Sequence, residues 1–168
     1  MRFHSLPESK RYPDDRSERD EVLRRHLVLL GELCALSGTQ TTELRVITVS
    51  GSSSTTPVPR AGRIARAFPS GRPWRSLQLD PDPGWPDDEP WWVHYFLGRC
   101  TLTSRRLRNL LRLVMVDRAE GVVIAPAGAQ WLYAPYDGGG DVIAPSTQVR
   151  EILRARHTDW LSVHPSGL

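Results

Sequence analysis

The residues best suited to chemistry gather near the start of the chain, in Arg2-Phe-His-Ser-Leu-Pro-Glu-Ser-Lys-Arg-Tyr12. The candidate binding side chains here are His4, Ser5, Glu8, Lys10, Arg11 and Tyr12. Lys10 is the only lysine among 22 basic residues. If this lead segment packs against a sheet, its polar side chains could line a pocket for an anionic ligand. If it is a loose terminus, they are solvated, and both interpretations stay open.

A second candidate region is Trp131-Leu-Tyr-Ala-Pro-Tyr-Asp-Gly-Gly-Gly-Asp-Val-Ile143. Its pattern predicts a hairpin, because glycines adopt positive φ without steric cost and aspartates hydrogen-bond nearby backbone in turns. The two carboxylates could instead converge on a cation or on a basic group of a partner, but the ligand alternation of an EF-hand loop is missing. We therefore favour a turn-forming role for them. The candidate binding residues here are Trp131, Tyr133, Tyr136, Asp137 and Asp141.

Known catalytic and metal-binding motifs are absent from the sequence. The five histidines have no zinc-ligand spacing, and no nucleophile elbow, phosphate-binding loop or dinucleotide fingerprint occurs. We predict no catalytic residue, no metal and no cofactor, and we expect His26 and His94 to be structural. The alternative is an enzyme or small-ligand protein that uses the lead segment with Tyr133, Tyr136 or Asp137. It predicts a concave pocket in which His4 meets a carboxylate.

Composition bounds the class of protein. With 168 residues, 39% of them hydrophobic, the chain is predicted to form a single domain over 1–168. No signal-peptide core and no membrane-spanning run occurs, which predicts a soluble cytoplasmic protein. The net charge of +3 permits attraction to acidic partners. Arg105, Arg108 and Arg112 could contact phosphates, but no nucleic-acid recognition motif supports that third hypothesis.

Hydrophobic periodicity predicts the elements that position these residues. An apolar stripe predicts a helix from a capping box at Ser17 and Asp20 to about Leu36, and Ser104 and Ser146 are expected to cap two more. Compact apolar runs predict strands at 44–49, 91–97, 121–125, 130–133 and 141–143. The Pro, Gly, Arg and Asp-rich region at 51–90 is expected to be irregular, with at most short strands. Together these predict an α+β fold, a mixed or antiparallel sheet of about five strands with three main helices packed on it.

Two segments carry a family resemblance. The opening Arg2 to Tyr12 segment resembles the start of uncharacterised actinobacterial proteins. The ending Tyr136-Asp-Gly-Gly-Gly-Asp-Val-Ile143, followed by a helix closing on Asp159-Trp160-Leu161, resembles a bacterial family of unknown function. The spacing of Trp131, Asp137 and the glycines is also similar to the SUKH superfamily, which implies an immunity protein that neutralises a toxin. We therefore expect a bacterial, non-catalytic protein-binding module that occludes a protein partner.

Overall fold

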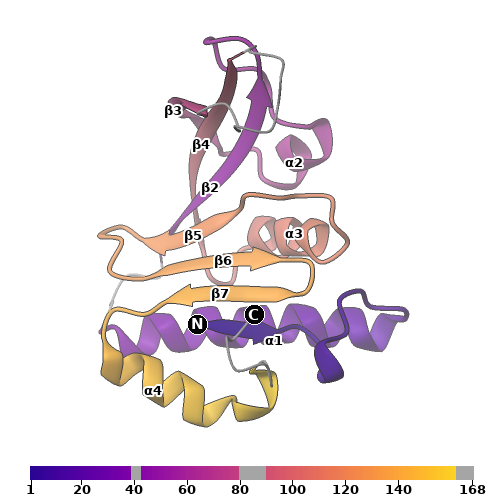
Figure 1. Ribbon diagram of the computed structural model, residues 1–168, viewed down its shortest axis with the longest axis vertical. Helices are drawn as coiled ribbons and strands as arrows, with labels where there is room; N and C mark the ends of the chain where they lie inside the picture. The colour runs from indigo at the N-terminus through magenta and orange to yellow at the C-terminus, as the bar shows by residue number, and fades with distance from the viewer. Residues whose placement is uncertain (39–42, 80–89, 162–168) are drawn as a thin grey trace.

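The computed structural model describes residues 1–38, 43–79 and 90–161, without the side chain of Ser9. Its centre is an antiparallel sheet of seven strands (Figure 1). The strands lie in the order β1 (Arg2–His4), β7 (Gly139–Ile143), β6 (Leu132–Tyr136), β5 (Val123–Pro126), β2 (Glu43–Ser52), β4 (Trp91–Thr101) and β3 (Arg72–Leu79). The α+β class is confirmed. The expected number of about five strands is wrong, because β1 and β3 extend the sheet at its two edges.

Three helices of ten residues or more accompany the sheet, α1 (Arg16–Leu36), α3 (Arg105–Val114) and α4 (Thr147–Arg156). Shorter pieces are α2 (Gly62–Ala67) and the 3-10 turns η1 (Pro7–Ser9) and η2 (Thr158–Trp160). Ser104 and Ser146 cap α3 and α4 as predicted. The predicted capping box of α1 is wrong by two residues: Asp15 is the cap and accepts from the Glu18 backbone N–H at 2.8 Å, whereas Ser17 lies inside the first turn.

The hydrophobic core lies between one face of the sheet and the helices. Alternate strand residues point to this face and are fully buried, among them Val46, Ile124 and Tyr133. They meet the apolar stripes of α1 and α3, which include Leu30 and Leu107. The residues between them on the same strands point to the opposite face of the sheet.

The strands β2, β4 and β3 extend beyond α1 and α4 (Figure 1). The reason is the pairing of β2, which meets β5 only over Leu44–Ile47 but meets β4 along its whole length. On the core side of this extension, the buried Arg60 donates to the Thr48 hydroxyl at 3.2 Å and to the Phe68 carbonyl at 2.9 Å. Within 51–90, the described residues thus include α2 and the eight-residue strand β3. No helix in the described part of the chain is long and apolar enough to span a membrane.

Candidate functional site

The lead segment begins with the edge strand β1 and packs against the glycine-rich hairpin. Phe3 pairs with Gly140 and His4 with Gly139, and the Ser5 backbone N–H donates to the Gly138 carbonyl at 2.9 Å. The two candidate regions of the sequence, more than 120 residues apart, are therefore one place in the structure. The lead is not a loose terminus.

The charged side chains of this lead–hairpin region are engaged with one another. Arg2 binds both carboxylate oxygens of Asp141, at 3.0 and 3.1 Å, and its guanidinium lies over the Tyr136 ring. Arg11 Nε donates to Asp137 Oδ2 at 2.6 Å. Lys10 bonds Asp14 and Glu18 near the start of α1. Because each of these cations already has a carboxylate partner, the region does not present a vacant anion pocket.

Asp137 has the turn-forming role predicted for it. It lies in the two-residue connection of β6 and β7, is 4% exposed, and accepts from the Gly138 backbone N–H at 2.9 Å. Burial raises the pKa of this carboxyl, but hydrogen bonds from Arg11 and Tyr12 outweigh it and hold the pKa below its usual value. A charged Asp137 thus joins the turn to the lead segment.

The glycines are needed for space rather than for positive φ, which corrects the expectation from the sequence. The described glycines with positive φ are Gly38 and Gly121, and none of Gly138, Gly139 and Gly140 is among them. A Cβ on Gly139 would overlap the Phe3 carbonyl oxygen of β1, and one on Gly140 would lie 2.6 Å from Tyr133 Cε2. The hairpin is glycine-rich because a neighbouring strand and a tyrosine ring lie against it.

The remaining candidates divide between core and surface. Trp131 and Tyr133 are fully buried, so both serve packing: Trp131 Nε1 donates to the Ser37 hydroxyl, and the Tyr133 hydroxyl lies 2.5 Å from His26 Nδ1. Glu8 and Tyr12 are exposed. A partner could therefore contact Glu8 and Tyr12 in this region, but not Trp131 or Tyr133.

The geometry required by the enzyme hypothesis is not present among the described residues. His4 Nε2 is buried with no hydrogen-bond partner, so no carboxylate is bonded to this nitrogen. Burial, with help from Arg2 and Arg25, lowers the pKa of His4. His94 is a satisfied structural histidine, as expected, with Ser76 Oγ at 2.8 Å and Ser52 Oγ at 3.1 Å. In the described ranges, no group of three His, Cys, Asp or Glu residues could hold a metal.

Replacing the two hairpin aspartates separately is expected to have unequal effects. Asp137→Ala removes a buried acceptor of charged and backbone donors and should lower the free energy of unfolding by about 2 kcal/mol. Asp141→Ala breaks a pair whose side chains are 32% and 43% exposed, and should cost less than about 1 kcal/mol. Urea denaturation of the two variants checks this. Equal losses would contradict the structural role assigned to Asp137.

A further surface, which no sequence motif marks, lies on β2, β4 and β3, on the side away from the helices. We call it the open face. Strand pairing places on it Ile47, Val49, Leu77, Leu79, Trp91, Val93, Tyr95 and Leu97, with Trp74 at its edge. The exposed fraction is 57% for Trp74, 51% for Trp91 and 47% for Leu79. Solvent-accessible tryptophan and leucine side chains thus share one patch.

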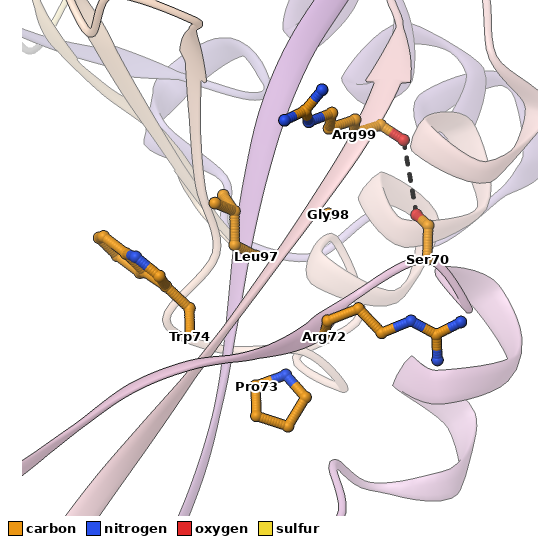
Figure 2. A pocket seen from close by; sticks show the side chains of 7 residues that line it. All are labelled: Ser70, Arg72, Pro73, Trp74, Leu97, Gly98 and Arg99. Carbon is orange, nitrogen blue, oxygen red and sulfur yellow. Dashed lines mark hydrogen bonds between the residues drawn. The ribbon is translucent and has the colours of Figure 1, made fainter.

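A β-bulge brings Trp74 to this face. The register shifts between Pro73 and Arg75, so Trp74 is an extra residue in β3. Figure 2 shows the Trp74 ring on the same side of β4 as Leu97. A pocket of about 400 Å³ opens here, lined by Ser70, Arg72, Pro73, Trp74, Leu97, Gly98 and Arg99. The Arg72 and Arg99 side chains extend in different directions (Figure 2), so they do not converge on one anion.

Comparison with known proteins identifies a family. Residues 1–165 match the model of a domain of unknown function, DUF3885. The chain belongs to this family. No curated protein and no solved structure matches it. The DUF3885 match supports the resemblance of the two terminal segments to an uncharacterised family and extends it over nearly all of the chain, whereas the SUKH likeness and the actinobacterial origin stay predictions.

Proposed function

We propose that this chain is a non-catalytic protein-binding module whose contact surface is the open face. The observation that carries the proposal is the exposure of Trp74, Leu77, Leu79 and Trp91 on two adjacent strands. Large apolar side chains gathered at a surface mark interaction sites in folded proteins. Tryptophan and arginine are enriched among the residues that dominate binding energies. Arg75 and Arg99 lie on the same two strands as these apolar side chains.

Side-chain contacts on the opposite side of the three strands also fix the shape of the open face. His94 is fully buried in β4, and its two ring nitrogens contact Ser52 of β2 and Ser76 of β3. These side-chain bonds join all three strands beneath the exposed residues. Trp91 lies against Gly51 of β2, where a Cβ would be only 2.8 Å from the indole nitrogen. A preformed surface loses less entropy on binding, which favours a partner of defined shape.

An immunity-like role, in which the partner is a toxin whose working surface is occluded, is one form of this function. The looser SUKH likeness supports that form. Coexpression separates it from other binding roles: an immunity protein protects the cell from one toxin encoded beside it, and a general adaptor protects from none.

The test is recovery of a partner by the tagged protein from the cells that encode it. The unmodified chain should recover a stoichiometric protein, and the Trp74→Ala/Trp91→Ala double variant should bind it at least about 10-fold more weakly. The matched control is Ile143→Ala, because Ile143 is 64% exposed but lies on β7, at the other end of the sheet. Repeated recovery of the protein alone, or a double variant that binds as well as Ile143→Ala, would reject the proposal. Circular dichroism verifies that each variant is folded.

A further inference from the structure

The outer edge of β3 is unlike the other edge of the sheet. β3 has eight residues, all exposed except the half-buried Ser76, and it pairs only with β4 among the described strands. The opposite edge strand, β1, has three residues and is bridged at Phe3 by Leu161. Edge strands are normally shortened, covered or interrupted, since their free backbone groups invite another strand. In β3 the interruptions, Pro73 and the bulge, lie in its first half, which leaves Ser76–Leu79 regular and, among the described residues, paired on one side only.

The outer edge of β3 is also positively charged. Arg72 and Arg75 are exposed, and no carboxylate of the described residues lies within ion-pair distance of either. Arg99 in the neighbouring strand has only a 3.7 Å contact with Glu43. A strand added to β3 would place its side chains about 5 Å from those of β3, close enough for opposite charges to stabilise the pair and for like charges to oppose it.

We propose that the partner docks by adding an extended strand to β3, and that this strand places an acidic side chain beside Arg75 and apolar side chains beside Leu77 and Leu79. This inference rests on the proposed function. Leu79, Leu77 and Arg75 lie on one face of β3, so every second residue of an antiparallel added strand would be apolar, apolar and then acidic along the open face. A second copy of this chain fits less well, because β3 has no acidic residue to place beside these arginines.

The probe is a labelled peptide, Val-Thr-Val-Thr-Glu-Thr-Glu, titrated with the full chain at low salt and followed by fluorescence anisotropy. The same peptide with lysine in place of glutamate is its control. We expect the acidic peptide to bind at least about 10-fold more tightly than the basic one. The Arg72→Glu/Arg75→Glu double variant should invert this preference. Arg105→Glu/Arg108→Glu, an equal charge change on exposed residues of α3, should not invert it.

Backbone pairing is tested with two N-methylated forms of the acidic peptide. In one form the methyl groups are on the odd residues, in the other on the even residues. Only one set of N–H groups faces a neighbouring strand, so one form should lose binding and the other should keep it. Binding by both forms, or an unchanged preference in Arg72→Glu/Arg75→Glu, would overturn strand addition. So would no binding of the acidic peptide at about 1 mM, or concentration-dependent dimers of the chain alone in sedimentation.

These outcomes are separable from failure of the proposed function. If Arg72→Glu/Arg75→Glu still recovers the cellular partner while Trp74→Ala/Trp91→Ala does not, the open face binds the partner and strand addition is wrong. If neither double variant changes recovery, both proposals fail.

Discussion

Alanine at Gly139 is expected to destabilise the protein by about 3 kcal/mol and to release β1 from the sheet. The added Cβ would overlap the carbonyl oxygen of Phe3, which is backbone and is fixed by the pairing of His4 with Gly139. Overpacking of this kind is relieved only by backbone movement. Urea denaturation measures the loss of stability, and hydrogen exchange of residues 2–5 measures the release of the strand.

Gly138→Ala is the matched control for this prediction. A Cβ at Gly138 would lie 3.3 Å from Tyr136 Cε2 and 3.4 Å from Arg11 Cγ, and both belong to side chains that can shift. The φ of Gly138 is not positive, so alanine is tolerated by the backbone. Its effect should stay within about 1 kcal/mol. If both variants unfold at the same urea concentration, the packing role of Gly139 is refuted.

The glycine run illustrates what a local pattern can predict. The Asp-Gly step between apolar runs predicts a hairpin, and β6 and β7 form one. The pattern does not show why three glycines are needed, because β1, the strand that lies against them, comes from the other end of the chain. Contacts such as Ser5 to Gly138 are not encoded in any local window, so the sequence alone could not join the two candidate regions.

The elements missed in the sequence are those with the weakest local signal. β1 has only three residues, and β3 contains Pro73, two arginines and a bulge that breaks its alternation. The five predicted strands are compact apolar runs and the three predicted helices have apolar stripes, because these elements contribute to the core. Exposed edge strands show neither pattern.

The open face was partly visible in the sequence. The run Trp91 to Leu97 is apolar on both faces, which is typical of an interior strand, and β4 does lie between β2 and β3. One of its faces packs on the core, through Phe96 and His94. No described helix covers the other face. Apolar alternation indicates that a face favours burial, but it does not say whether a helix of the same chain or another molecule supplies the cover.

Acidification is expected to destabilise the protein through the buried His26. Its ring is 2% exposed, its Nε2 has no hydrogen-bond partner, and burial lowers its pKa from 6.5 to about 4. Between these values the unfolded chain binds a proton that the folded chain does not, so stability falls as the pH falls. The full loss is about 3 kcal/mol, reached near pH 4. It is measured as the free energy of unfolding in urea from pH 7.5 to 4.5.

The range from pH 7.5 to 4.5 separates the effect of His26 on stability from that of the acidic side chains. Glu21, bonded by Arg24 and opposed by its own burial, has its pKa lowered to about 2, so the stability that it contributes is lost only below about pH 4.5. His4, also lowered by burial, acts in the same direction as His26. The variant His26→Gln should therefore lose most of the pH dependence of stability and keep only the small part that comes from His4. Tyr133→Phe removes the hydroxyl partner but leaves the imidazole buried, so it should be less stable with the slope retained. An unchanged slope in His26→Gln would mean that other groups couple folding to pH, since a neutral buried imidazole can act only where it is present.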